Sequence, residues 1–599
     1  MDWKTPRPDL IAAAGIASAL SAAIVFASPD GDDPRIEAWA EEWPDYVEMY
    51  MTTKEMDNPT PFGGNYPYSK LIRYPGKQAL WAGYAFAVDF NEDRGHYYTQ
   101  IDQMETKRND KEYLNAHGLP AFNGQPGACM NCHSGWSPIL TEEMGWAEFN
   151  RTPYWDTIEK LRGEYGHGVE GAQLGSSCND CHNPSDMSLR VNRQAFIDAM
   201  VMRGYEEDPA SGLKGSPREM RDYVCAQCHV EYYFQGQDAI LTYPWTEWPK
   251  DQPLRFEMVE EYYDTARESG VFAQDWTHAV TKAPMLKMQH PEFEVVSSGV
   301  HSSMIGCVDC HMPKTEWNGR QVTDHTMGSP LKKIENCLSC HNSMTADEMY
   351  QRVYDIQVDV IAAYLTAEKA VLALIEDVAT VRETLAGLEP FSQIADAAER
   401  EGAISEELSL VLDYHRRASM RWDWIGASNS TGAHSPGEAL RVLDQAVDMA
   451  QDGQALLVEV AARHGIELVP TINPTLPDAP TPIRGDDIVG SLPPAIAHAA
   501  DRRVQDRLTR VAAAETTSND AMPSVDGKQA FIDANCSQCH SVSSEDITAT
   551  MMGLEIDGIG GRRDAANIEA YLRAGPPHPL AWTGSDADLS AVAEWLASK

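Results

Sequence analysis

The spacing of apolar and polar residues divides the chain of 599 residues into parts of different character. Residues 345–388 and 396–464 carry Ala, Leu, Val and charged residues at helical spacing with few Gly or Pro, which predicts two or three long helices. Residues 34–342 lack this regularity and are rich in Gly, Pro, Trp and Tyr, so we expect many loops there. The fold is therefore predicted to be mainly α-helical, with a loop-rich body followed by long helices suited to packing or dimerisation.

The amino-terminal residues 1–30 have the features of a targeting segment. Lys4 and Arg7 precede an apolar run from Leu10 to Ala27. A run of this length after basic residues indicates either a signal peptide, cleaved near Ala27, or a retained membrane anchor.

The carboxyl-terminal part of the chain changes character twice more. Residues 466–525 contain many prolines, then a short Ala/Arg-rich helix and a polar Thr/Ser/Asn stretch, which predicts a linker that is first semi-rigid and then flexible. Residues 526–599 predict a separate small all-α domain, with one helix around Gly527–Ala534, a glycine-rich middle and a closing helix at Ser585–Ala597.

The chain is strongly acidic, with 48 Lys and Arg against 90 Asp and Glu and a formal net charge of −42. Such a surface repels polyanions, so binding to nucleic acid or to an anionic membrane is not expected. A small anionic substrate is compatible with this charge if its site carries local positive charge. The 43% of hydrophobic residues indicate a folded protein and not a disordered acidic chain.

All twelve cysteines belong to six copies of one motif, Cys-x-x-Cys-His. This is the attachment signature of c-type haem, in which two thiols bind the porphyrin and the histidine binds the iron. Redox dithiols, zinc sites or disulfides are the alternatives, but they do not require a histidine after every pair. We therefore expect six covalently bound haem c groups and an exported protein. The attachment residues are Cys129, Cys132, His133, Cys178, Cys181, His182, Cys225, Cys228, His229, Cys307, Cys310, His311, Cys337, Cys340, His341, Cys536, Cys539 and His540.

The last motif lies in residues 526–599, whose size and order of elements resemble a small monohaem cytochrome c domain. That family usually has a distal methionine shortly before the last helix. This chain has His578 in the sequence Pro-Pro-His-Pro instead. We expect His578 to be the sixth iron ligand, with a methionine or an open iron as alternatives.

Four longer strings in the body look like the ammonia-forming pentahaem cytochrome c nitrite reductases. The strings are Cys225–Phe234, Lys282–Glu292, Cys307–Pro313 and Thr323–His325. The resemblance covers about residues 40–470 and includes the order of five haem motifs. It implies a five-haem catalytic region at 31–344 and a long-helix region of the same domain at 345–465.

The resemblance also implies roles for individual residues. The haem on Cys129, Cys132 and His133 is expected to be catalytic and open on its distal face, with Arg108, Tyr232 and His290 around it. Calcium is expected to bind the side chains of Glu231 and Gln289 and the backbone carbonyls of Tyr232 and Lys287. The distal histidines of the second to fifth haems are expected to be, in that order, His325, His96, His434 and His301.

These residue types suit the reduction of nitrite to ammonium. Arg108 offers a permanent cation with forked donors, and His290 can donate protons near neutral pH. Carboxylate and carbonyl oxygens suit calcium. The implied setting is the periplasm, with a quinol-linked membrane donor or a cytochrome as partner and a homodimer as assembly. Conversion of hydroxylamine, nitric oxide or sulfite is an alternative, as is an electron conduit in which every iron has six ligands.

The chain departs from the family pattern in two respects. Most members have lysine where His133 stands, so the potential and the rate profile of the catalytic haem are in question. The second departure is the fused sixth motif, because typical members receive electrons from a separate cytochrome. A tethered haem domain raises the local concentration of the donor without imposing one docking position.

Overall fold

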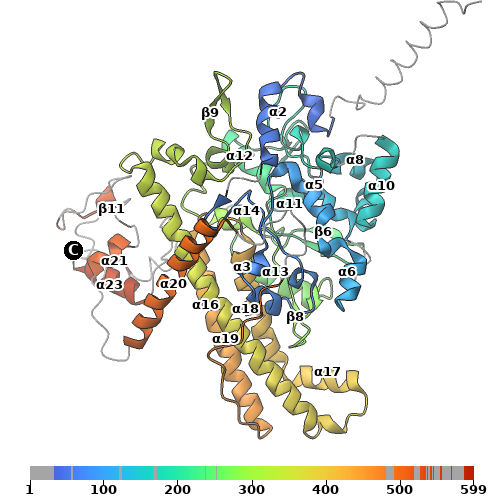
Figure 1. Ribbon diagram of the computed structural model, residues 1–599. Helices are drawn as coiled ribbons and strands as arrows, with labels where there is room; N and C mark the ends of the chain where they lie inside the picture. The colour runs from blue at the N-terminus through green and yellow to red at the C-terminus, as the bar shows by residue number, and fades with distance from the viewer. Residues whose placement is uncertain are drawn as a thin grey trace, which may run out of the picture.

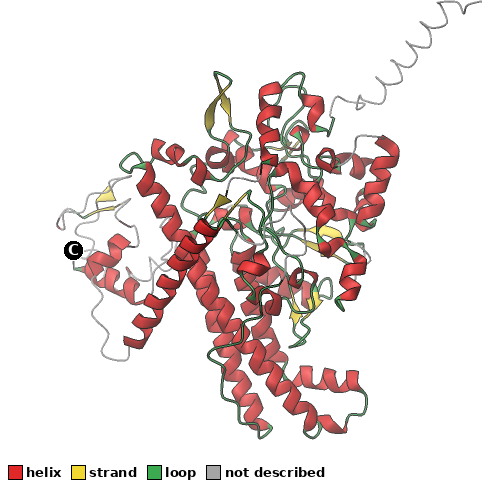
Figure 2. Ribbon diagram, viewed as in Figure 1, coloured by secondary structure: helices red, strands yellow, loops and turns green. Residues whose placement is uncertain are grey.

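The computed structural model describes residues 33–55, 59–119, 125–165, 171–236, 238–250, 252–480, 492–517, 527–533 and 586–598, with a few further residues between 536 and 568. The described chain is mainly α-helical, as the sequence predicts, and its strands form small two-stranded sheets (Figure 1, Figure 2). The predicted signal peptide or anchor lies outside the described residues. Among the residues that are described, no helix combines the length and the apolar character needed to cross a membrane.

The body before residue 345 consists of short elements joined by loops. Its helices are η1 (Ile36–Trp39), α2 (Pro44–Met51), η2 (Thr52–Lys54), α3 (Lys70–Arg73), α4 (Gly76–Leu80), η3 (Ala85–Ala87), η4 (His96–Tyr98), α5 (Thr99–Glu105), η5 (Lys107–Asn109), α6 (Lys111–Ala116), η6 (Gly127–Cys129), α7 (Met130–His133), α8 (Ser137–Met144), α9 (Trp146–Arg151), α10 (Tyr154–Tyr165), η7 (Gly171–Leu174), η8 (Cys178–Asp180), α11 (Gln194–Met202), α12 (Pro217–Ala226), α13 (Phe256–Glu268), α14 (Glu292–Ser297), α15 (Cys307–His311), η9 (Pro330–Lys332) and η10 (Ile334–Ser339). Its antiparallel strand pairs are β1 (Pro59–Thr60) with β2 (Gly63–Gly64), β3 (Glu207–Asp208) with β4 (Gly212–Leu213), β5 (Tyr233–Gln235) with β6 (Ile240–Thr242), β7 (Trp276–Thr277) with β8 (Pro284–Met285), and β9 (Lys314–Trp317) with β10 (Arg320–Thr323).

Helix α12 shows how local sequence places a haem motif. Ser216 and Glu219 form a capping box at its start, and Pro217 occupies the first turn, where its missing N–H costs nothing. Met220 and Tyr223 are buried on one face of the helix. The last turn carries Cys225, so the capped and packed helix fixes where the third motif begins.

Four helices follow the fifth motif: α16 (Ala346–Gly387), α17 (Ala397–Glu407), α18 (Ser409–Ala427) and α19 (Pro436–Arg463). Helices α16, α18 and α19 pack against one another around one apolar core and extend away from the body (Figure 1). The predicted segment 396–464 is thus divided into three helices. The break before α19 includes Gly432, with φ of 80°, where a Cβ atom would lie 2.5 Å from the Val360 side chain.

Part of the segment predicted as a linker is fastened to α16. Thr471 donates from its backbone and hydroxyl to Asp377, and the Thr475 N–H donates to Glu376 at 2.6 Å. Helix α20 (Pro494–Thr517) is longer than the predicted short helix. It packs on α16 through the buried side chains of Ala500 and Val504, beside Phe62, Val358 and Ala362.

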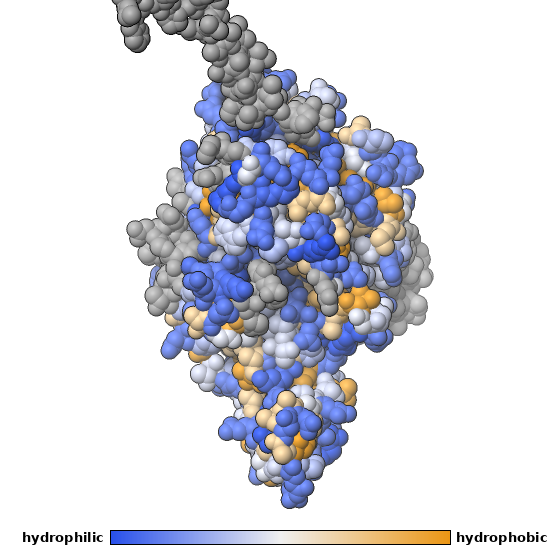
Figure 3. Space-filling model, turned by 90° about the vertical axis from the view of Figure 1, so that its right-hand side faces the viewer, coloured by the Kyte–Doolittle hydropathy of each residue, from blue (hydrophilic) through white to orange (hydrophobic). Residues whose placement is uncertain are grey.

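The carboxyl-terminal unit has helices at both predicted places, α21 (Gly527–Asp533) and α23 (Asp586–Ala597), and a parallel strand pair, β11 (His540–Ser541) with β12 (Leu554–Glu555). Its two helices share a core that includes Phe531, Val592 and Leu596. Cys539 and His578 lie outside the described residues, as does the side chain of His540. The face of the molecule in Figure 3 is mostly hydrophilic with scattered apolar residues, as the acidic composition leads one to expect.

Candidate functional site

A continuous cavity of about 3740 Å³ runs through the body. Protein interiors are normally close-packed, so a cavity of this size indicates space for large prosthetic groups. Its walls are mostly apolar, and they contain residues of all five motifs of the body together with Cys536 of the sixth. The motif residues in the wall are Cys132, His133, Cys178, Cys181, His182, Cys225, Cys228, His229, Cys307, Cys310, His311, Cys337 and His341.

Four motif histidines each face a second imidazole across this cavity. The ring centroids are 6.0 Å apart for His182 and His325, 6.2 Å for His229 and His96, 6.2 Å for His311 and His434, and 6.1 Å for His341 and His301. A metal–imidazole bond is about 2 Å long, so two imidazoles on opposite sides of one metal have centroids about 6 Å apart. The spacing in all four pairs therefore fits a haem iron between the rings.

His133 of the first motif differs from these four. Among the described residues, no second imidazole faces it at the same spacing. Its Nδ1 lies 3.0 Å from the carbonyl oxygen of Thr99. Donation from Nδ1 to a carbonyl leaves Nε2 available to a metal and fixes the plane of the ring.

Two of the other proximal histidines, His182 and His311, are oriented in a similar way. The Nδ1 atoms of His182 and His311 lie 2.8 Å and 3.3 Å from the carbonyl oxygens of Met187 and Gly328. The surrounding backbone thus presents Nε2 of these side chains to the cavity.

Contacts around the cysteines give the order in which the motifs adjoin. The Cys132 Sγ of the first motif lies 4.0 Å from the Gln227 carbonyl oxygen of the third, and the Cys307 N–H of the fourth motif donates at 2.9 Å to Asp222, three residues before Cys225. Cys181 of the second motif also interacts with Cys225. The fourth and fifth motifs adjoin in turn, because Cys310 interacts with Cys337. The third motif is therefore the junction between the first motif and the others.

The three predicted catalytic side chains all lie within electrostatic range of the first motif. Arg108 and His290 both interact with His133, and Tyr232 interacts with Cys129 and with Cys132. Burial, followed by these two thiols, raises the pKa of Tyr232 well above its usual range, which keeps the phenol protonated as a hydrogen-bond donor.

Arg108 is held in place by its neighbours on a short helical turn. Its Nη1 donates to the carbonyl oxygen of Asp89 at 2.8 Å, and its guanidinium lies 4.2 Å from the centre of the Phe86 ring. The Asp89 carboxylate in turn accepts from the Thr106 hydroxyl at 3.0 Å and from the Lys107 N–H at 2.6 Å. Asp89 thus fixes the turn that carries Arg108.

His290 has a carboxylate partner that the sequence reasoning missed. Its Nδ1 makes a short contact with Glu292, whose other oxygen accepts from the Asn429 N–H at 2.5 Å. Burial lowers the pKa of His290, but the charge and the hydrogen bond of Glu292 outweigh it and raise the pKa to about 9. Burial raises the pKa of Glu292, and His290 more than offsets this, lowering it to about 2. The only sequence signal for this pair is that Glu292 follows His290 by two positions.

The histidine–carboxylate pair also adjoins the third motif. Ligand atoms of His229, His290 and Glu292 all lie within 4.8 Å of one another, and the rings of His229 and His290 are 4.6 Å apart. Because His229 faces His96 as one of the four imidazole pairs, this cluster belongs to the haem environment.

Three of the four predicted calcium ligands, Glu231, Gln289 and Lys287, lie close together. The Glu231 carboxylate accepts from the Gln289 N–H at 2.7 Å, and the Gln289 side-chain amide lies 3.3 Å from the Lys287 carbonyl oxygen. Glu231 and Glu294 are both fully buried, and one oxygen of Glu294 has no hydrogen-bond partner. Burial raises the pKa of Glu294 to about 8. The partnerless oxygen of buried Glu294, together with the buried Glu231 carboxylate and the Lys287 carbonyl, fits a hard divalent cation such as calcium.

The side chain of Lys287 forms a buried ion pair beside this group. Its ammonium lies 3.0 Å from Asp423, which also accepts from the Met288 N–H at 2.9 Å, and its own N–H donates to Asp275 at 2.7 Å. These bonds fix the backbone between β8 and His290.

The cavity, the six attachment motifs and the four imidazole pairs together define a c-type cytochrome with several haems. The chain belongs to the cytochrome c552 family, whose model matches residues 35–518. Covalently bound haem c with iron is the cofactor of this family, and the chain is an oxidoreductase of the multihaem cytochrome c type.

Relatives with the same family name are similar over most of their length. Cytochrome c-552 of Bacteroides fragilis is 32% identical over 466 residues, which cover 77% of this chain and 83% of the relative. Cytochrome c-552 of Aliarcobacter butzleri is 32% identical over 449 residues, covering 72% and 79%. A solved structure of cytochrome c nitrite reductase from Desulfovibrio desulfuricans, described with two calcium sites in its catalytic subunit, has a TM-score of 0.59 at 27% identity and covers 72% of this chain and 88% of its own.

Proposed function

We propose that this chain reduces nitrite to ammonium at the haem of the first motif. The observation that carries the proposal is the difference between His133 and the other four body motifs. His133 is oriented as an iron ligand and faces no second imidazole in the described chain. The charges of Arg108 and His290 act on it, and Tyr232 lies within electrostatic range of Cys129 and Cys132 of the same motif. The similarity to a cytochrome c nitrite reductase supports nitrite as the substrate.

Arg108 is the residue proposed to attract and orient nitrite. A guanidinium keeps its charge at all physiological pH values and can bind two oxygens of one anion through parallel N–H groups. The contacts with Asp89 and Phe86 restrict its movement, so less conformational entropy is lost when nitrite binds. On a chain with a net charge of −42, this local cation is what permits an anionic substrate.

His290 is the proposed proton donor, with Tyr232 as a second hydrogen-bond donor. When bound, the haem iron supplies electrons and a coordination site for nitrogen. Glu292 keeps the imidazole of His290 charged at neutral pH and fixes its orientation, and Asn429 fixes Glu292. A proton held at His290 can then be given to an oxygen of the substrate as an N–O bond breaks.

The remaining body haems are proposed to carry electrons toward the first. We assign His325, His96, His434 and His301 as distal ligands of the second, third, fourth and fifth haems, on the spacing of the imidazole pairs. Because the third motif adjoins the first, second and fourth, electrons reach the catalytic haem through the third. A calcium ion held by Glu231, Gln289 and the carbonyls of Tyr232 and Lys287 is proposed to fix the backbone near His290.

The carboxyl-terminal unit is proposed to bind a sixth haem, with His578 as distal ligand, and to pass electrons into the body. Helix α20, which precedes this unit, packs on α16, and Cys536 lies in the wall of the same cavity as the body motifs. The proposed setting is the periplasm, with a quinol-linked membrane donor or a cytochrome supplying electrons to a homodimer.

Nitrite reduction driven by a reduced dye, with ammonium measured as product, tests this function. We expect ammonium in proportion to nitrite consumed and a high-spin haem signal that nitrite shifts. If no ammonium is formed, the proposed product is rejected. If every haem iron has six ligands, the proposed open site is rejected. Arg108→Gln should raise the KM for nitrite severalfold, whereas Lys107→Gln, which removes the neighbouring cation, should not.

A further inference from the structure

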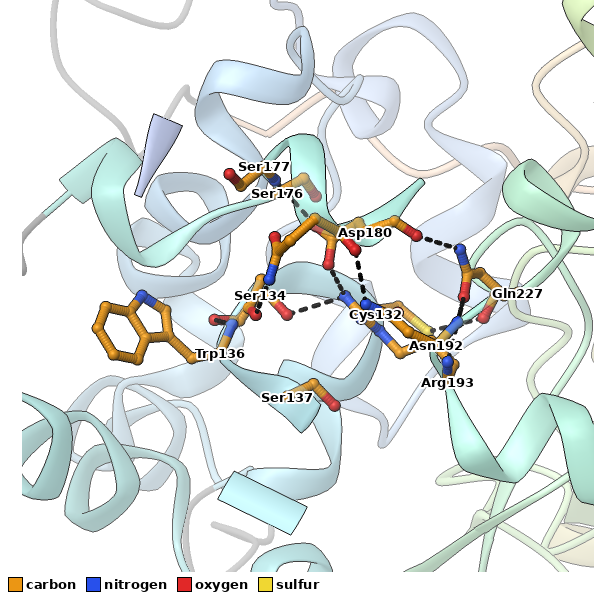
Figure 4. Close-up of polar contacts among 12 residues, drawn as sticks. Cys132, Ser134, Trp136, Ser137, Ser176, Ser177, Asp180, Asn192, Arg193 and Gln227 are labelled. Atoms are coloured by element: carbon orange, nitrogen blue, oxygen red, sulfur yellow. Dashed lines mark hydrogen bonds and ion pairs between the residues drawn. The ribbon is translucent and has the colours of Figure 1, made fainter. Parts of the chain in front are cut away.

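One buried arginine contacts the same position in three haem motifs (Figure 4). The position is the residue directly before the second cysteine: Asn131 in the first motif, Asp180 in the second and Gln227 in the third. Arg193 is 1% exposed and these three residues are at most 5% exposed, so the whole group is shielded from water. It lies outside the substrate and calcium residues described above.

The guanidinium of Arg193 joins the first motif to the second. Its Nε donates to the carbonyl oxygen of Asn131, and its Nη2 donates to the carbonyl oxygen of Ser134 at 2.9 Å. The same Nη2 lies 2.7 Å from the Asp180 carboxylate. The other oxygen of Asp180 accepts from the Ser177 N–H at 2.9 Å, which holds the carboxylate within the turn of its own motif.

The third motif is tied to this group through Gln227. Its side-chain oxygen accepts from the N–H groups of Asn192 and Arg193, at 3.1 Å and 3.2 Å. Its side-chain nitrogen donates to the carbonyl oxygen of Asp180 at 2.7 Å. Both ends of the Gln227 amide are therefore used, one toward the arginine segment and one toward the second motif.

The fourth motif provides an internal contrast. Asp309 holds the equivalent position there and pairs with Arg221 at 3.1 Å, but both side chains are about one-third exposed. Ion pairs at the surface contribute little, whereas buried polar groups with complete hydrogen bonding restrict the structure to one arrangement. The buried arrangement is found at the first three motifs, which include the proposed catalytic haem and the third motif beside it.

We propose that Arg193, with Asp180 and Gln227, is a positioning residue that fixes the catalytic haem relative to the second and third haems. This inference deepens the proposed nitrite reduction and rests on it for its effect on turnover. Electron transfer between haems depends steeply on their separation and orientation. Arg193 bonds the backbone of the first attachment segment and the Asp180 carboxylate of the second through its side chain, and Gln227 of the third through its N–H, so it sets that separation without touching substrate.

Arg193→Lys tests the proposal, because lysine keeps the positive charge but cannot make the forked contacts. In the haem-loaded full chain we expect altered magnetic coupling between the high-spin first haem and the low-spin third haem. We also expect a fall in kcat by a factor of about 10 to 100, with little change in the KM for nitrite. Arg421→Lys is the matched control, since Arg421 is also buried and makes a bidentate ion pair, with Glu260.

Wild-type coupling and kcat in Arg193→Lys would overturn the proposal. If this variant lacks haem, peptide mass spectrometry identifies the motifs that have lost it. Haem loss confined to the first three motifs supports the proposal, and haem loss at all five body motifs overturns it. Asp180→Asn, which keeps the shape of the carboxylate, should change the coupling in the same direction but less. The magnetic coupling is measured without nitrite. If the wild-type enzyme does not reduce nitrite, the proposed function is rejected, but the coupling still tests the role of Arg193.

Discussion

The haem-binding body and the helices that follow it are stabilised in different ways. In α16, α18 and α19 the buried residues, such as Leu374, Leu443 and Leu457, touch one another and form a continuous core. The body has short elements around a cavity of about 3740 Å³, and its attachment segments are joined by buried polar groups such as those at Arg193. A filled apolar core therefore stabilises the long helices, whereas the body combines smaller apolar clusters with buried hydrogen bonds and leaves space for haem.

Buried charge is common to both regions. Around the site, Glu231, Glu294, Lys287 and Asp423 are all buried, which is costly unless partners or a cation compensate. Asp423 itself lies on α18, and so does Arg421, which is buried in an ion pair with Glu260. The large cavity is therefore what separates the body from the long helices.

Replacing Cys129 and Cys132 by alanine removes the covalent attachment of the first haem. We expect nitrite reduction to fall to the rate measured without enzyme, while the four pairs of histidine ligands keep their low-spin spectra. Circular dichroism should show that the long helices persist. Loss of helical signal together with the haem would contradict the independence of the two regions.

His290→Asn should lower kcat by a factor of about 10² to 10⁴, the usual range for loss of a general acid. Turnover with a reduced dye measures this effect. His464→Asn is the control, because His464 also pairs with a glutamate, Glu407 at 3.0 Å, but lies at the far end of α19. An equal loss in both variants would remove His290 from the mechanism.

Leu457→Ala should destabilise the helical region by about 2–5 kcal/mol, because it opens a cavity in a close-packed core. Denaturant unfolding followed by helical circular dichroism measures the change, and haem spectra at low denaturant should stay constant. Leu410→Ala, at a position 68% exposed, is the control and should change stability little. A change of haem spectra in Leu457→Ala would show that the core and the body are coupled.

Glu231→Gln should weaken calcium binding by a factor of about 10 to 100 and lower turnover, since the site supports the backbone near His290. Calorimetry with added calcium and assays with a chelator measure the two effects. Unchanged activity after calcium removal, with calcium shown to be absent, would contradict the role proposed for the ion.

Arg503→Ala removes an ion pair with Asp355 between α20 and α16, in which both side chains are more than 40% exposed. Surface pairs contribute about 0.2–1 kcal/mol, so we expect a small loss of stability and unchanged turnover. Thermal unfolding of the full chain measures the loss of stability. A loss of several kcal/mol would show that charge, more than the buried Ala500 and Val504, holds α20 in place.

Sequence reasoning succeeded where the pattern is local. The motif Cys-x-x-Cys-His specifies haem attachment within five residues, and the spacing of apolar residues in 345–464 predicts long helices. The breaks between helices within 396–464 were not predicted. Gly432 is needed at one of them because a side chain there would meet Val360, which is distant in the chain. Glu292 and Arg193 were also missed, since a single charged residue carries no sequence signal of burial.

The roles of the distal histidines needed more than the motif. Each lies far along the chain from the proximal histidine that it faces, as in His96 with His229 and His434 with His311. Resemblance suggested these pairs, and the ring spacings are geometric support that the sequence does not contain. Histidine has the same chemistry in a core, on a surface or at an iron, so its surroundings decide its role.

The sequence by itself determined that this chain is a c-type cytochrome with a mainly helical fold, because covalent attachment and helical periodicity are encoded within a few residues. Only the tertiary structure decided which histidines face one another, that the third motif adjoins the first, and that Glu292 accompanies His290. These relations depend on distances between segments that are remote in the chain. They are set by packing and by buried polar groups such as Arg193, whose effect exists only once the segments meet.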